Sequence, residues 1–191
     1  MGKLIFAPTL FFLSGCAATV PVQYVPEHAH PSRFTPGSRP YSFDCDTEAG
    51  KYSELNDATS GTNPWITGFM QVVTSRPGSA WPPDAGVVFA GTSKLPRVGL
   101  EAFVLPDNPA ILQIAVRGIG GAGDHTVFAS MPMSDARIRF TLRLSDSGQL
   151  SLSVGDATTT SSIGSVEITR VNLYCSSSHV HFSDVLAGSD K

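Results

Sequence analysis

Apolar and polar residues alternate along most of the chain beyond residue 40, as they do in strands that bury one face. The alternation is most regular in residues 138–144, and it resumes in 150–154 after the polar turn 145–148. This pattern predicts a hairpin with one apolar and one polar face. Further strands are predicted at 41–44, 66–73, 85–90, 99–105, 110–116, 126–130, 165–174 and 179–186. In 165–174 the alternation changes phase, which predicts a bulge at residues 169 and 170.

No stretch of the chain shows the apolar repeat of about 3.6 residues that marks a major helix. The 18 glycines and 14 prolines among 191 residues favour frequent turns instead. About ten short strands separated by turn residues predict an all-β fold, an antiparallel β-sandwich or barrel without a major helix. The predicted domain, 41–191, is long enough to bury a substantial core.

The last predicted strand carries a more specific pattern. It contains Val180-His181-Phe182-Ser183-Asp184-Val185, an aromatic residue followed by Asp-Val. This pattern resembles the closing strand of concanavalin A-like jelly rolls. The resemblance implies a jelly-roll-like sandwich.

The N-terminus has the organisation of a secretory signal peptide. Lys3 precedes the apolar run 4–13, which is much shorter than the roughly 20 residues that a membrane-spanning helix needs. The run ends in Leu13-Ser14-Gly15-Cys16, which closely resembles the lipobox of bacterial lipoprotein signal peptides. The resemblance implies cleavage before Cys16 and lipid on that residue. Because Ala17 rather than aspartate follows, resemblance to Gram-negative lipoproteins implies delivery to the outer membrane.

The sequence therefore predicts three segments. Residues 1–15 form the signal peptide, 16–40 a lipidated proline-rich tether, and 41–191 the β-sandwich domain. In the tether a proline recurs about every fifth residue, which opposes both helices and central strands. Several acyl chains on Cys16 would hold such a chain stably at the membrane.

Two cysteines, Cys45 and Cys175, remain once Cys16 is assigned to lipid. An even pair in an oxidising compartment favours a disulfide. Cys45 follows the first predicted strand and Cys175 ends the penultimate one. Because the terminal strands of jelly rolls lie side by side, a bridge between them is geometrically plausible.

Composition and motifs argue against several function classes. The net charge of −3 does not favour a partner made of nucleic acid. Residues 118–123 match G-x-G-x-x-G, but a predicted strand rather than a helix follows, so no dinucleotide site is expected. No nucleophile, Walker or zinc-protease motif is present. The sequence therefore predicts no cofactor and no catalytic residues, and hence a protein that is not an enzyme.

Two groups of residues are candidate metal ligands. His179 and His181 face the same side of one predicted strand, where they could form half of a zinc or copper site, with His125 as a possible third ligand. An acidic segment, Asp44 to Glu48, loosely resembles a calcium loop, although its glycine is misplaced. Solvated polar residues are the more ordinary interpretation of both groups, and no metal is predicted.

The two tryptophans are the candidate ligand-binding residues. Trp65 and Trp81 both adjoin prolines, in segments that read as loops, where exposed indoles could stack on sugar rings. Indoles packed over one end of the core are the alternative. Arg137, Arg139 and Arg143 line a polar strand face that could meet anionic glycans or lipid headgroups, or could be a solvated edge.

These observations favour an envelope lipoprotein with a non-catalytic β-sandwich that binds a glycan or an envelope polymer. A structural or assembly subunit of an outer-membrane complex, with protein partners, is the first alternative. A glycan hydrolase is the second, because concanavalin A-like folds include such enzymes.

Overall fold

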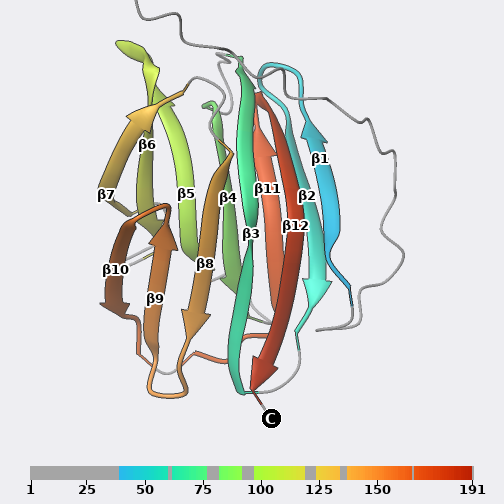
Figure 1. Ribbon diagram of the computed structural model, residues 1–191, viewed down its shortest axis with the longest axis vertical. Helices are drawn as coiled ribbons and strands as arrows, with labels where there is room; N and C mark the ends of the chain where they lie inside the picture. The colour runs from blue at the N-terminus through green and yellow to red at the C-terminus, as the bar shows by residue number, and fades with distance from the viewer. Residues whose placement is uncertain are drawn as a thin grey trace, which may run out of the picture.

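The computed structural model describes residues 39–59, 62–76, 82–91, 97–118, 124–133, 137–164 and 166–190. These residues form twelve strands and no helix. Every strand pairing is antiparallel, and two six-stranded sheets pack face to face (Figure 1). The predicted antiparallel β-sandwich without a major helix is confirmed. The signal peptide, Cys16 and all but the last two residues of the tether lie outside the described residues.

The first sheet, sheet A, contains the long central pair of strands. Its spatial order is β1 (Tyr41–Asp46), β12 (Ser178–Asp190), β3 (Thr62–Ser75), β8 (Ile138–Leu144), β9 (Gln149–Val154) and β10 (Ala157–Ser162). The last strand of the chain thus lies between the first and the third, as the closing strand of a jelly roll does (Figure 1).

The second sheet, sheet B, is mostly a meander. Its spatial order is β2 (Tyr52–Ala58), β11 (Arg170–Ser176), β4 (Asp84–Ala90), β5 (Arg97–Leu105), β6 (Asn108–Arg117) and β7 (His125–Pro132). Alternate residues of both sheets point inward and form one apolar core between them. Its largest fully buried members include Phe89, Phe140 and Phe182.

Two strands were not predicted from the apolar pattern. Both β2 and β10 lie at sheet edges, where little of a strand is buried, so their sequences YSELNDA and ATTTSS carry almost no apolar alternation. The predicted strand 165–174 is also shorter than expected. It begins at Arg170 as β11, so the change of phase marks the start of the strand and not a bulge within it.

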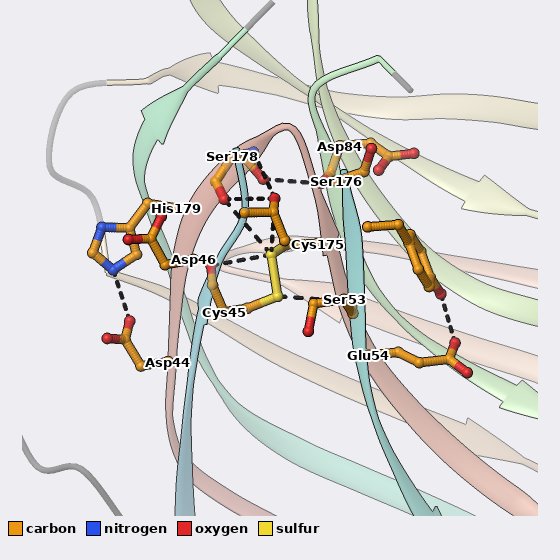
Figure 2. The surroundings of a disulfide bond; sticks show 12 residues. Asp44, Cys45, Asp46, Ser53, Glu54, Asp84, Cys175, Ser176, Ser178 and His179 are labelled. Atoms are coloured by element: carbon orange, nitrogen blue, oxygen red, sulfur yellow. Dashed lines mark hydrogen bonds and ion pairs between the residues drawn. A yellow bond between two sulfur atoms is a disulfide. The ribbon is translucent and has the colours of Figure 1, made fainter. Parts of the chain in front are cut away.

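A disulfide joins Cys45 on β1 to Cys175 on β11, as predicted (Figure 2). The two strands belong to different sheets, and the two Cα atoms are 6.0 Å apart. Beside the bridge the buried Thr47 hydroxyl donates a hydrogen bond to the Ser178 carbonyl oxygen at 3.1 Å. The bridge therefore fixes one end of the sandwich by tying the two sheets together.

The described part of the chain contains no helix of the length and apolarity needed to cross a membrane.

Candidate active site

The outer face of sheet B is unusually buried for a face that points away from the core. Val88 and Ala90 of β4, Asn172 of β11 and Ala115 of β6 all point outward and are at most 1% exposed. Sheets of this kind ordinarily present a solvated outer face. Side chains on this face are therefore held in a poorly solvated environment, where charges interact strongly.

Four ionisable side chains meet at the centre of that face: Asp84, Glu101, Arg117 and Tyr174. We call them the sheet B cluster. Each comes from a different strand, namely β4, β5, β6 and β11. The pairing register brings them together, because Tyr174 lies opposite Gly86 and Gly86 lies opposite Glu101. Glu101 is only 8% exposed and Tyr174 only 2%.

Gly86 allows Tyr174 to lie across the sheet. A Cβ atom at position 86 would come within 2.7 Å of Tyr174 Cε1 and 2.8 Å of its hydroxyl oxygen. The phenol ring therefore occupies the space that any other residue would fill. In this position the Tyr174 hydroxyl lies over β4, where it accepts a hydrogen bond from Arg117 Nη1 at 2.8 Å.

Arg117 connects the cluster. The same Nη1 atom donates to Glu101 Oε1 at 3.1 Å, and the guanidinium carbon lies 5.4 Å from the centre of the Tyr174 ring. Burial raises the pKa of Tyr174 well above its usual value, and the charge of Glu101 raises it further, so this phenol is neutral. His125 of β7 borders the cluster, its Nδ1 atom 3.9 Å from Glu101 Oε2.

Asp84 is the most strongly perturbed carboxyl group of the cluster. Burial raises its pKa to about 7, and the charge of Glu101 and a hydrogen bond with that residue act in the same direction, while Arg117 opposes them. Asp84 and Glu101 thus lie close enough for the charge of one to act on the other, and we call them the acid pair. Among the described residues nothing hydrogen-bonds to Asp84 Oδ1, although this atom is buried. A buried carboxyl oxygen without a partner is costly and is found at functional sites.

A second polar group lies beside the cluster, toward the edge of sheet B. Tyr52 stacks on Tyr174 with ring centres 5.8 Å apart, and its hydroxyl donates to Glu54 Oε2 at 2.6 Å. Arg97 Nη2 lies 3.2 Å from the same carboxylate oxygen. Burial raises the pKa of Glu54, but the hydrogen bonds from Tyr52 and Asn56 and the charge of Arg97 outweigh it, so the pKa is lowered. Tyr52 is 37% exposed, and it presents an aromatic surface next to the cluster.

The residues singled out in the sequence lie elsewhere. Trp65 belongs to strand β3 and not to a loop, and it lies half-buried on the outer face of sheet A. Trp81 is outside the described residues. His179 and His181 do share one face, and both approach Asp44 Oδ1, at 2.7 and 3.8 Å (the contact with His179 is drawn in Figure 2).

The proposed third metal ligand is far from these histidines, because His125 belongs to sheet B. The acidic segment does not converge either, since Asp44 contacts His179 while Asp46 pairs with Arg76. Within the described ranges no three His, Cys, Asp or Glu side chains are placed to hold a metal ion.

Solved structures with the same fold include several glycan-degrading enzymes. A polysaccharide lyase of family 18 has a TM-score of 0.55 and 9% identity, over 75% of this chain and 82% of that chain. An alginate lyase from Pseudomonas aeruginosa has a TM-score of 0.50 and 13% identity over 68% of this chain, which spans 65% of that enzyme. A β-1,3-1,4-glucanase derived from a mouse hindgut metagenome has a TM-score of 0.50 and 9% identity, over 71% and 70% of the two chains.

At these identities the similarity establishes a jelly-roll β-sandwich of the concanavalin A-like kind. No protein-family model matches the sequence, and no curated protein sequence does so.

These structures contradict the prediction that the chain is not an enzyme, because glycan lyases and a glucanase share its fold. The prediction was wrong in its reasoning as well. It relied on the absence of a contiguous catalytic motif, whereas the ionisable groups of this face come from four strands spread between residues 84 and 174. A motif search along the chain does not detect such a site.

Proposed function

We propose that this chain is a glycan-cleaving enzyme of the cell envelope and that its acid–base chemistry takes place on the outer face of sheet B. The observation that carries the proposal is the acid pair, in which Asp84, with a pKa raised to about 7, lies beside the buried Glu101, and Arg117 bridges Glu101 and Tyr174. The fold supports it, since glycan lyases and a glucanase are built on the same sandwich.

The acid pair suits proton transfer at neutral pH. A general acid or base is most effective when its pKa lies near the working pH, and burial brings Asp84 to about 7. Glycosidases that use two carboxyl groups in separate roles keep them about 5 to 9.5 Å apart, with the sugar between them. The charge of Glu101 acts directly on Asp84, so we assign the two residues a joint role as one acid–base unit.

The groups around the acid pair have supporting roles. Arg117 holds the Glu101 carboxylate by a direct hydrogen bond and supplies positive charge next to the reacting groups. Tyr52, which is 37% exposed and stacks on the buried Tyr174, offers an aromatic surface on which a sugar ring can lie.

The proposal is tested by incubating the purified chain with alginate, polygalacturonate and mixed-linkage β-glucan. New reducing ends report cleavage, and ultraviolet absorbance of an unsaturated uronate distinguishes elimination from hydrolysis. We expect Asp84→Asn to lower kcat at least about 100-fold on the substrate that is cleaved, because the variant has no proton to transfer.

Asp57→Asn is the matched control for this experiment. Burial also raises the pKa of Asp57, to about 6, but this residue lies on edge strand β2, on the same side as the core-facing Leu55. It should keep full activity. Cleavage of none of the polysaccharides, or undiminished activity of Asp84→Asn, would contradict the proposal.

We further propose that the domain is held at the outer membrane by lipid on Cys16, which the sequence Leu13-Ser14-Gly15-Cys16 after a short apolar run supports. Mass spectrometry of the membrane-extracted protein should find an acylated N-terminus at Cys16. Cys16→Ala should move the chain out of the membrane fraction. Recovery of a mature chain that carries an unmodified Cys16 thiol would refute this anchoring.

A further inference from the structure

The outer face of sheet A carries a second constellation, which the proposed chemistry does not use. It consists of two aromatic and three basic side chains around strands β3 and β8: Trp65, Phe69, Arg137, Arg139 and Arg143. We call these five residues the arginine–aromatic patch. Sheets A and B form opposite layers of the sandwich, so this patch and the acid pair face away from each other (Figure 1).

The register of the two strands places each ring next to an arginine. Trp65 lies opposite Arg143, and Phe69 lies opposite Arg139. The guanidinium carbon of Arg143 is 6.0 Å from the centre of the Trp65 ring, and that of Arg137 is 4.0 Å from the centre of the Phe69 ring. Both distances fall within the range of cation–π contacts.

Hydroxyl groups occupy the space between the two ring–arginine pairs. The Thr67 and Thr141 hydroxyl oxygens are 3.0 Å apart, and Thr67 donates to the Phe140 carbonyl oxygen at 2.9 Å. The patch therefore alternates aromatic, basic and hydroxyl groups along two neighbouring strands. These groups match the apolar faces, carboxylates and hydroxyls of an acidic sugar chain.

Two of the three charges of the patch are not neutralised by described carboxylates. Arg137 forms an ion pair with Asp184, but no described carboxylate lies within ion-pair distance of Arg139 or Arg143. Both of these arginines are exposed. Two unpaired cations on the same face of one strand are notable in a chain whose net charge is −3, and they create a local field that attracts anions.

Trp65 is held in place by a glycine on the neighbouring strand. A Cβ atom at Gly188 would come within 2.7 Å of Trp65 Cζ2, so the indole occupies the space above this residue of β12. The ring is half-buried against the sheet. A ring held in this way loses little freedom when a sugar stacks on it.

We propose that the arginine–aromatic patch binds an acidic polysaccharide at a site separate from the acid pair. Trp65 provides the stacking surface, and Arg139 and Arg143 bind carboxylate or sulfate groups along the chain. The observations favour a polysaccharide over a lipid surface because both rings are half-buried among strand neighbours, whereas membrane-binding aromatics project into the interface. The inference concerns binding only, and it does not depend on cleavage at sheet B.

The experiment is affinity electrophoresis of the purified full-length chain in gels that contain polygalacturonate, with neutral dextran gels as the reference. Asp84→Asn serves as the background so that the polymer stays intact. We expect polygalacturonate to retard this protein and dextran to leave it unaffected. The Arg139→Gln/Arg143→Gln double variant should bind about tenfold more weakly or worse, and Trp65→Ala several-fold more weakly.

Lys51→Gln is the matched control, since it removes one positive charge from an exposed position in the β1–β2 connection. It should bind like the background protein. Thermal unfolding of each variant verifies that lost binding is not lost folding. Unchanged affinity of the folded double variant would overturn the proposal. So would binding to vesicles that contain phosphatidylglycerol, without retardation by polygalacturonate, because the patch would then meet a membrane surface.

These outcomes are independent of the catalytic proposal. A chain that cleaves nothing still binds polygalacturonate if the patch is assigned correctly. A chain whose patch variants bind normally still loses cleavage in Asp84→Asn if the acid pair is assigned correctly.

Discussion

Replacing both Cys45 and Cys175 by alanine is expected to lower the free energy of unfolding by about 4–5 kcal/mol. The bridge closes a loop of 130 residues, and the loss of loop entropy in the unfolded chain grows with loop length. It also joins β1, which lies at one edge of sheet A and pairs only with β12, to the neighbouring sheet.

Urea unfolding followed by tryptophan fluorescence measures the effect. A reducing agent should bring the wild-type protein to the stability of the double variant and should leave the variant itself unchanged, which makes the variant its own control. Equal stability of the wild type and the double variant without reductant would show that the bridge contributes nothing to the fold. A stability difference that remains after reduction would instead point to a packing defect.

The long buried strands could be predicted from the sequence, because a strand with one buried face must alternate. Strands β8 and β9 and the turn between them lie where the alternation places them. The disulfide could also be predicted from the parity of the remaining cysteines, although it joins strands of different sheets and not side-by-side terminal strands as the jelly-roll pattern suggested. The edge strands β2 and β10 could not, because side chains at a sheet edge need not be apolar.

The sheet B cluster could not be predicted from the sequence. Its members stand singly in four strands, and local sequence does not say which strand pairs with which. One signal was available in residues 98–104, where a single glutamate interrupts an otherwise apolar strand. A charge in a strand of that kind must be solvated or paired, so Glu101 could have been recognised as a buried charge in need of partners.

The second large effect that we expect is a pH-dependent stabilisation by Asp84→Asn. The pKa of Asp84 in the folded protein is about 7, because the group is buried and lies beside Glu101, against 3.8 for an ordinary aspartate. Below about pH 4 the carboxyl is protonated in both the folded and the unfolded chain, so its ionisation does not lower the free energy of unfolding. Between about pH 4 and 7 the unfolded chain loses the proton and the folded chain retains it, so stability falls as the pH rises.

Above about pH 7 the loss of stability caused by Asp84 reaches its full value, on the order of 4 kcal/mol from the difference between the folded and unfolded pKa values. Asparagine does not titrate, and its amide can donate to Glu101 as the protonated acid does. Asp84→Asn should therefore equal the wild type in stability near pH 4 and exceed it by several kcal/mol at pH 8. Urea unfolding at a series of pH values measures this difference directly.

This prediction separates a catalytic acid pair from a structural one. A carboxyl group that holds the sheet together would make Asp84→Asn less stable than the wild type at every pH. A carboxyl group retained for catalysis makes the folded protein less stable at neutral pH. Its removal therefore lowers activity and raises stability. The combination that we expect, a more stable protein at pH 8 that no longer cleaves its glycan, follows only if Asp84 is kept buried and protonated for proton transfer. A variant that is destabilised across the whole pH range would assign the sheet B cluster to the fold instead.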